Sequence, residues 1–300
     1  MSKFAHTVFF LLTFFVVPSC QSEQVPVDTD LESSEIQINP ITVNQLIDSK
    51  NVSRITYVRT PKDLDQDASY PFVFFFHGAG GSAQDFLNNN KINELIQSGE
   101  FIGVFPNGYS NNGGNGGFWN LGSEPSSADD VEFVNLIMEE LSAFRFIDPT
   151  RGYALGYSNG SGMVNLLGKT TTHFKAIAPL FSQQTAGIGS RIPDKALSVF
   201  QINGEIDGLI PLDGGESPVG VFMSAEDSAL NWSRSFDCNS SPVEEEFVWG
   251  TTTLRSFSYS NCQDNHEIKY GVALETDHGW RDGSTQQVVI EEIWRFFKQH

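Results

Sequence analysis

The chain has 300 residues, 39% of them hydrophobic and 12% aromatic, so it can bury a large core, and an α/β domain of this size is commonly a single unit. Its formal net charge of −19 at pH 7 gives a surface that repels nucleic acid and anionic membranes, which argues against both as partners. Solubility explains such a charge without any specific role.

The N-terminal segment has the composition of a leader followed by a tether. An apolar run at 8–17 is too short to span a bilayer and fits a secretory signal peptide. It ends in Val17-Pro-Ser-Cys20, which resembles the lipobox of bacterial lipoproteins, so we predict a signal peptide at 1–19 and lipidation of Cys20. A conventional signal peptide with an incidental cysteine is the alternative. Residues 20–35, rich in Ser, Gln and acids, predict a flexible tether. We therefore predict that the protein is exported to the periplasm or the outside of the cell. Its one membrane contact would be a lipid anchor in the bacterial outer membrane.

The remaining cysteines agree with export. If Cys20 carries lipid, Cys238 and Cys262 are an even pair in an oxidising compartment. A bridge between them would close a loop of roughly two dozen residues and contribute on the order of 3 kcal/mol. Metal binding is the poorer interpretation, because two cysteines without C-x-x-C spacing make no zinc site.

Strands dominate the first part of the domain. Residues 36–47 and 52–59 roughly alternate apolar and polar side chains, which predicts half-buried strands, and a surface turn follows at 61–70. Residues 71–76 form a continuous apolar run, typical of a strand buried on both faces of a parallel sheet. A helical pattern then begins at Gln84.

A glycine-rich turn, His77-Gly-Ala-Gly-Gly81, follows the apolar strand. Such a turn can aim a backbone N–H, that of Ala79, at a substrate carbonyl oxygen as part of an oxyanion hole. A phosphate loop is a weaker interpretation because no G-K-[ST] follows. His77 more often braces a loop of this kind than serves as a base. It is also a candidate for the substrate cleft.

The next segment carries a buried strand at 101–105 and a long Asn/Gly loop at 107–117 that leads to Trp119. We expect this loop to shape a substrate cleft, with Trp119 either as a wall or as a structural plug beneath the loop. An acidic N-cap at 126–130 and an apolar stripe at helical spacing over 131–144 predict a packed helix.

The pattern Gly156-Tyr-Ser-Asn-Gly160 lies between a short apolar strand at 152–157 and a helical pattern that begins at Met163. Serine at a sharp strand-to-helix turn takes a strained backbone, and the flanking glycines remove Cβ atoms that would collide. The pattern predicts Ser158 as a nucleophile, with the N–H of Asn159 as the second oxyanion donor.

Two loops supply candidates for the partners of this serine. Strands at 174–180 and 196–202 lead to a loop in which Asp207 is the preferred acid, Glu205 the second choice and Asp213 a turn residue. A helix at 222–236 and strands at 244–249, 253–259 and 268–274 lead to His278, the expected base, before a closing helix at 286–297. Asp277 is an unsuitable orienter because adjacent side chains diverge, and His173 and His266 have polar, surface-type surroundings.

Several dispersed motifs in one order resemble the polyhydroxybutyrate depolymerase and feruloyl esterase family of secreted serine esterases. They include His77-Gly78, Phe105-Pro-Asn-Gly108, Trp119-Asn120, Asp129-Asp-Val131, Gly156-Tyr-Ser-Asn-Gly160, Asn203-Gly-Glu-Ile-Asp207, Ile210-Pro211, Trp232, Cys238, Cys262 and His278-Gly-Trp280. The resemblance implies an α/β-hydrolase fold at 36–300, with a mostly parallel sheet flanked by helices. It also implies a Ser158–Asp207–His278 triad, a Cys238–Cys262 disulfide, and no metal or organic cofactor.

The chain departs from that family beside the base. Thr276 and Asp277 precede His278 where glycines are usual, and Arg281 follows Trp280 where proline is usual. These changes lie at the rim of the site, where Tyr157 and Trp280 are further cleft candidates, so they concern the substrate more than the chemistry. We expect a polymeric or oligomeric ester substrate, either a hydroxyalkanoate polyester or a feruloyl or acetyl ester of polysaccharide. A serine peptidase and a non-catalytic binding lipoprotein are the alternatives, and the sequence leaves the oligomeric state open.

Overall fold

The structure is a computed structural model that describes residues 37–110, 117–122 and 127–300. The predicted signal peptide at 1–19, the lipidation of Cys20 and the tether at 20–35 lie outside these ranges. Residues 35–300 form one structural unit. Among the helices of the described ranges, none combines the length and the hydrophobicity that crossing a membrane requires.

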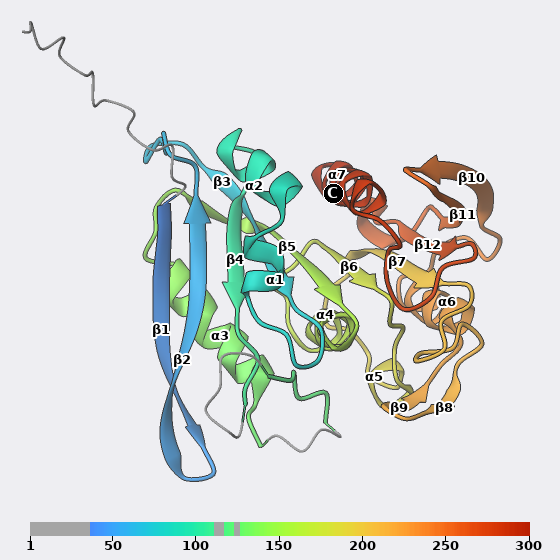
Figure 1. The fold of residues 1–300 in the computed structure, drawn as a ribbon, viewed down its shortest axis with the longest axis horizontal. Coiled ribbons are helices and arrows are strands. Elements are labelled where there is room, and N and C mark those ends of the chain that lie inside the picture. The colour runs from blue at the N-terminus through green and yellow to red at the C-terminus, as the bar shows by residue number, and fades with distance from the viewer. Residues whose placement is uncertain (1–36, 111–116, 123–126) are drawn as a thin grey trace, which may run out of the picture. The chain divides into compact units, whose positions relative to one another are not determined.

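A ten-stranded sheet crosses the described part of this unit in the order β1-β2-β4-β3-β5-β6-β7-β12-β11-β10 (Figure 1). The strands from β4 to β12 in that order are parallel, and the pairs outside them are antiparallel. Their bounds are β1 (Gln37–Ile47), β2 (Lys50–Thr60), β3 (Tyr70–Phe76), β4 (Ile102–Pro106), β5 (Ile147–Tyr157), β6 (Ala176–Leu180), β7 (Ser198–Gly204), β10 (Val243–Trp249), β11 (Thr252–Tyr259) and β12 (Ile268–Ala273). The mostly parallel sheet predicted from the sequence is confirmed.

Helices cover both faces of the sheet. Apolar side chains of α3, α4 and α6 belong to one buried cluster, and those of α1, α2 and α7 belong to another. The helices are α1 (Gln84–Leu87), α2 (Asn90–Gln97), α3 (Asp130–Leu141), α4 (Asn159–Thr170), α5 (Ala186–Gly189), α6 (Ala225–Ser235) and α7 (Gly283–Lys298), with a 3₁₀ turn, η1 (Gln263–Asn265). Polar side chains start α3, α6 and α7, because the side chains of Asp129, Ser224 and Asp282 each accept an N–H of the first turn.

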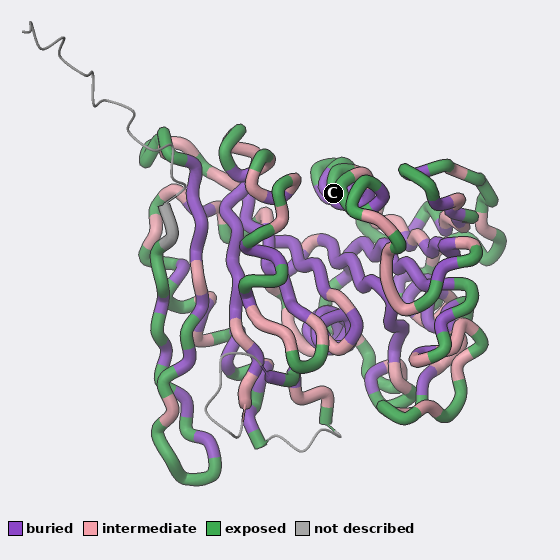
Figure 2. The backbone as a smooth tube through the Cα atoms, viewed as in Figure 1, coloured by how far each residue is buried: buried purple, intermediate pink, exposed green. Residues whose placement is uncertain are grey.

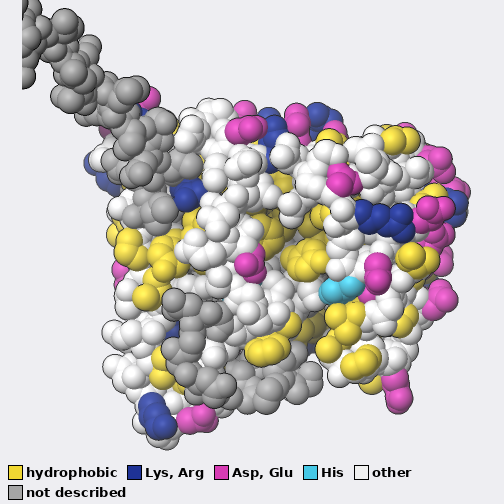
Figure 3. Space-filling model, in the orientation of Figure 1, with side chains coloured by type: hydrophobic (Ala, Val, Ile, Leu, Met, Phe, Trp, Pro, Cys, Tyr) yellow, Lys and Arg dark blue, Asp and Glu magenta, His cyan; other side chains and the backbone are white. Residues whose placement is uncertain are grey.

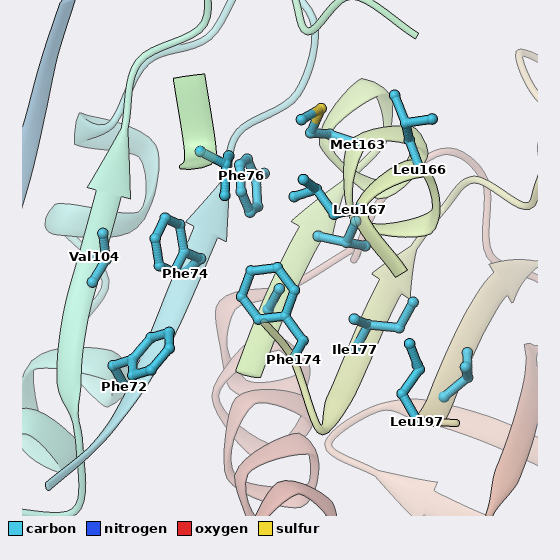
Figure 4. Close-up of a cluster of buried hydrophobic side chains, with 14 of the residues drawn as sticks. Phe72, Phe74, Phe76, Val104, Met163, Leu166, Leu167, Phe174, Ile177 and Leu197 are labelled. Atoms are coloured by element: carbon cyan, nitrogen blue, oxygen red, sulfur yellow. The ribbon is translucent and has the colours of Figure 1, made fainter. Parts of the chain in front are cut away.

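Strand β3 shows why the core has two halves. Phe72, Phe74 and Phe76 point into the cluster that contains α4, as Figure 4 shows, whereas Val73 and Phe75 point into the cluster that contains α7. Side chains alternate across a strand, so an unbroken apolar run serves both faces. Figure 2 shows the result as buried backbone along the central strands. The predicted two-sided burial of this strand is confirmed.

The outer strand β10 carries three consecutive glutamates. Glu244, Glu245 and Glu246 are exposed along it, and Figure 3 shows acidic side chains gathered at this side of the molecule. Charged side chains on an edge strand discourage pairing with another chain. Part of the net negative charge therefore protects the sheet edge.

Cys238 and Cys262 form a disulfide, with a sequence separation of 24 residues. It joins the segment after α6 to the segment after β11, and Cys262 is buried. The disulfide implied by the family resemblance is therefore present.

Three short elements were not expected from the sequence. The helical pattern that begins at Gln84 is split into α1 and α2, because the side chain of Asn89 caps a new helix through the N–H of Ile92. A small hairpin, β8 (Gly215–Ser217) with β9 (Gly220–Phe222), precedes α6, so that helix begins at Ala225 rather than at 222. The third is the single turn α5.

Candidate active site

Ser158 lies at the turn between β5 and α4, on a backbone with φ 55° and ψ −117°. Few residues other than glycine adopt this conformation. A Cβ on Gly156 would collide with the backbone of Gly160, and a Cβ on Gly160 would collide with the carbonyl oxygen of Phe76. The two glycines therefore allow the sharp turn, and Ser158 N–H donates to Leu180 O at 2.9 Å.

The hydroxyl of Ser158 belongs to a hydrogen-bonded chain of three side chains. His278 Nε2 lies 2.8 Å from Ser158 Oγ, and His278 Nδ1 lies 2.7 Å from Asp207 Oδ2. Asp207 is 5% exposed, and its Oδ1 accepts the N–H groups of Leu209 and Ile210. A carboxylate fixed in this way can orient the imidazole so that Nε2 faces the hydroxyl.

The other acids of these loops lie elsewhere. Glu205 is exposed, and its Oε2 accepts the N–H of Glu275 at 2.8 Å. Asp213 is exposed beyond the loop. Asp277 accepts the backbone N–H groups of Gly208 and His278, and these bonds lower the pKa of its carboxyl. The structure thus brings Asp207, and not its neighbours, to the imidazole.

Ala79 and Asn159, the expected oxyanion donors, line the same pocket as Ser158. Within residues 37–110, 117–122 and 127–300, no group accepts a hydrogen bond from the backbone N–H of either residue. The glycine-rich turn is held in place because Gly80 N–H donates to Gly117 O at 2.9 Å. Two free N–H groups beside the hydroxyl can receive a negatively charged oxygen.

The pocket at Ser158 has a volume of about 410 Å³. Among the described residues, most of the lining is apolar and no lining side chain is charged; the lining residues are Ala79, Phe118, Leu121, Ser158, Asn159, Ser182, Thr185, Leu209, Ile210, Pro218, Val219, Gly220 and Phe222. The hairpin β8–β9 supplies one wall, and it is tied to the body where Thr185 bridges Phe222. Figure 3 shows apolar side chains beside an exposed histidine on one face of the molecule. The pocket suits a neutral, apolar group.

Known proteins share this architecture. A scan against models of protein families finds no match. The chain is 25% identical over 255 residues to feruloyl esterase B of Piromyces equi, which covers 82% of this chain and 45% of that protein. It is 26% identical over 232 residues to the probable feruloyl esterase C of Aspergillus clavatus, covering 75% of this chain and 80% of that protein. An acetyl xylan esterase from Aspergillus awamori matches with a TM-score of 0.62 and 14% identity, over 87% of this chain and 100% of that one. The chain has an α/β-hydrolase fold.

The α/β-hydrolase fold explains why residues far apart in sequence meet. Ser158 follows β5, Asp207 follows β7 and His278 follows β12. The carboxyl ends of parallel strands meet at one edge of a sheet, and this fold carries its reactive side chains there in the order Ser, Asp, His.

Two of the cleft candidates, His77 and Trp119, do not face the pocket. Both are 0% exposed. His77 Nε2 accepts the N–H of Gly108 at 2.9 Å, and Trp119 Nε1 donates to His77 O at 2.8 Å. As substrate-cleft candidates both were therefore wrong. The alternatives stated with them, a bracing role for His77 and a structural plug for Trp119, agree with this burial and these hydrogen bonds. Phe118, 44% exposed, lines the pocket instead.

The other two candidates, Tyr157 and Trp280, are half-buried beside His278. The hydroxyl of Tyr157 donates to His278 O at 2.7 Å, and burial, aided by the charges of Asp207 and Asp277, raises the pKa of Tyr157 to about 12. Trp280 packs edge-on against Phe181 at 4.7 Å between ring centroids. Tyr157 therefore stays protonated and can keep donating to the backbone of His278.

Histidines away from the site are less exposed than expected. His173 and His266 are half-buried, and burial lowers the pKa of each.

In the described ranges, no group of three or more His, Cys, Asp or Glu side chains is arranged to hold a metal ion.

Proposed function

We propose that the protein is a serine carboxylic-ester hydrolase that works through an acyl-enzyme. The observation that carries this proposal is the chain Ser158–His278–Asp207, with hydrogen bonds of 2.8 and 2.7 Å, at the mouth of a pocket with two unpaired backbone N–H groups. The arrangement provides a nucleophile, a base with its orienting acid, and a receptor for negative charge.

The reaction follows from these positions. His278 Nδ1 donates to Asp207, so Nε2 is free to accept the proton of Ser158 Oγ as that oxygen attacks the ester carbonyl. The carbonyl oxygen becomes negatively charged and accepts from the N–H groups of Ala79 and Asn159. The C–O bond to the alcohol then breaks, and the alcohol leaves with the proton from Nε2. Water, deprotonated by the same nitrogen, releases the acid and restores Ser158.

The substrates we favour are feruloyl or acetyl esters of polysaccharide. Two relatives carry the name feruloyl esterase, and a protein of the same fold is an acetyl xylan esterase. The apolar pocket of about 410 Å³ has room for an acetyl or an aromatic acyl group. Hydroxyalkanoate polyester remains a prediction from the sequence resemblance. A lipid anchor at Cys20, with export to the periplasm or the outside, would suit fragments of an external polymer.

The fold itself does not choose between an esterase and a peptidase. The pocket favours the esterase, because none of its described lining residues has a charged side chain that could pair with a peptide terminus. A non-catalytic binding lipoprotein, the other alternative, has no use for the strained backbone at Ser158, which destabilises the fold unless it serves a function.

The test is hydrolysis of p-nitrophenyl acetate and butyrate by the full chain and by Ser158→Ala. We expect turnover to fall by at least ~10³-fold in the variant. Equal rates would eliminate the mechanism, and failure of the parent to react with a fluorophosphonate would revive the binding lipoprotein. Feruloyl-sugar, acetyl-xylan and hydroxybutyrate esters assayed in parallel identify the acyl group, and an aminoacyl-nitroanilide tests the peptidase.

A further inference from the structure

Two loops meet at the acid–base pair. The acid loop (residues 205–210) follows β7 and the base loop (residues 274–279) follows β12, and these strands are neighbours in the sheet (Figure 1). Gly204 lets them approach, because a Cβ there would lie 2.5 Å from the carbonyl oxygens of Thr276 and Asp277.

Hydrogen bonds between the loops bracket Asp207 on both sides. On the N-terminal side, Ile206 N–H donates to Thr276 O at 3.1 Å. On the C-terminal side, Gly208 N–H donates to Asp277 Oδ1 at 3.1 Å. The same Oδ1 accepts His278 N–H at 2.8 Å. One carboxylate oxygen thus joins the residue after the acid to the backbone of the base.

We propose that Asp277 is a positioning residue that holds Asp207 and His278 in register by bridging Gly208 and His278. The inference rests on the proposed function for its kinetic readout, and its geometry is independent of any substrate. It concerns a residue at which the chain departs from the family pattern, where glycine would offer no bridging oxygen.

The surroundings of Asp277 support a local role. Its side chain is exposed, so it adds little to the core. Its carboxyl has a lowered pKa because two backbone N–H groups donate to it, so it remains a strong acceptor in mildly acidic solution. The backbone of His278 is held from the other side by Tyr157, whose hydroxyl donates to its carbonyl oxygen. Asp277 thus holds the backbone N–H of His278, Tyr157 holds its carbonyl oxygen, and Asp207 holds the ring at Nδ1. A shift of this backbone would move the ring relative to Ser158, and small misplacements cost up to ~10²-fold in rate.

The experiment compares Asp277→Ala, Asp277→Asn and Glu205→Ala in the full chain on p-nitrophenyl butyrate. Asn keeps an oxygen in the place of Oδ1 but loses the charge, and Ala loses both. Glu205 is the matched control, because it is also an exposed carboxylate that accepts one N–H across the same two loops, at Glu275. We expect Asp277→Ala to lower kcat by about 10- to 100-fold with KM within ~2-fold, Asp277→Asn to keep kcat within ~3-fold, and Glu205→Ala to resemble the parent.

Three kinetic outcomes overturn the inference. They are a parent-like kcat in Asp277→Ala, an equal loss in Asp277→Asn, which would assign the effect to charge, and an equal loss in Glu205→Ala, which would assign it to general loosening of the loops. A second readout needs no substrate: the far-downfield ¹H NMR signal of His278 Nδ1–H, shared with Asp207, should persist in Asp277→Asn and broaden in Asp277→Ala. An unchanged signal in Asp277→Ala also overturns the inference. If the parent hydrolyses no ester, the proposed function fails, and the NMR comparison still decides the role of Asp277.

Discussion

The two carboxylate oxygens of Asp207 have different hydrogen-bond partners. Oδ1 accepts the N–H groups of Leu209 and Ile210, which leaves Oδ2 for His278 Nδ1. In Asp207→Asn the amide oxygen can still satisfy the loop, but its NH₂ group then faces Nδ1 and favours the wrong tautomer of the imidazole. We expect turnover to fall about 10³- to 10⁴-fold. Steady-state kinetics with Glu205→Gln as control checks this, and a larger loss in the control would move the acid to Glu205.

The meeting of Ser158, Asp207 and His278 was predictable from the sequence because each follows an apolar strand, and in a parallel sheet such positions lie close together. The roles of His77 and Trp119 could not be decided in this way, because the sequence allowed each either a place in the cleft or a structural place. Both are buried, and they are joined through hydrogen bonds to Gly108 and to the backbone of His77, contacts that only the fold reveals. The bridge from Asp277 to Gly208 could not be seen either, since it depends on how closely two loops approach.

At the scale of elements, the turn from β5 into α4 depends on Gly160. A Cβ at this position would collide with the carbonyl oxygen of Phe76 in β3, and backbone cannot move aside as a side chain can. Gly160→Ala should therefore destabilise the protein by about 2–4 kcal/mol and abolish fluorophosphonate labelling of Ser158. Gly283→Ala, at the open start of α7 with nothing within 4 Å, should leave stability equal or raise it by up to about 1 kcal/mol. Urea unfolding compares the two, and equal midpoints would contradict the collision.

Long elements were predicted well and short ones poorly, for a physical reason. The apolar run that identifies β3 and the helical spacing that identifies α3 both need several residues, whereas β8 and β9 have three residues each and α5 has four. The hairpin is held by distant contacts, such as Met223 N–H donating to Gln184 O at 3.0 Å. The position of this hairpin as a wall of the pocket could therefore be seen only in the three-dimensional structure.

For the molecule as a whole, the disulfide restricts the unfolded chain. Cys238 and Cys262 are separated by 24 residues, so breaking their bond in Cys238→Ala/Cys262→Ala should cost about 3 kcal/mol of unfolding free energy. In a protein of this size that corresponds to a fall in Tm of several degrees. Scanning calorimetry of parent and double variant measures it, with the parent in reductant as a second comparison. An unchanged Tm would show that the closed loop contributes nothing.

A buried cation opposes the folded state. Lys169, in the last turn of α4, is 2% exposed, contacts Asn231 and the ring of Trp232, and has no acidic partner among the described residues. Burial lowers the pKa of its amine to about 8, from an ordinary 10.5. Between these two values the unfolded chain binds more protons than the folded one, so this group makes stability rise as the pH rises through that window. Below this window the amine is protonated in both the folded and the unfolded chain, so its full destabilising effect is present and no longer changes with pH.

Lys169→Met and Lys169→Arg separate this effect from packing. Met removes the titrating amine, so unfolding free energy at pH 7 should rise by about 1–3 kcal/mol and its increase from pH 8 to 10 should be smaller than in the parent. Arg stays charged throughout this range, so it should keep the destabilisation and also show a smaller increase. Urea unfolding of all three proteins at several pH values gives the comparison. A parent that gains no more stability than Lys169→Met between pH 8 and 10 would mean that the amine is not buried in its charged form.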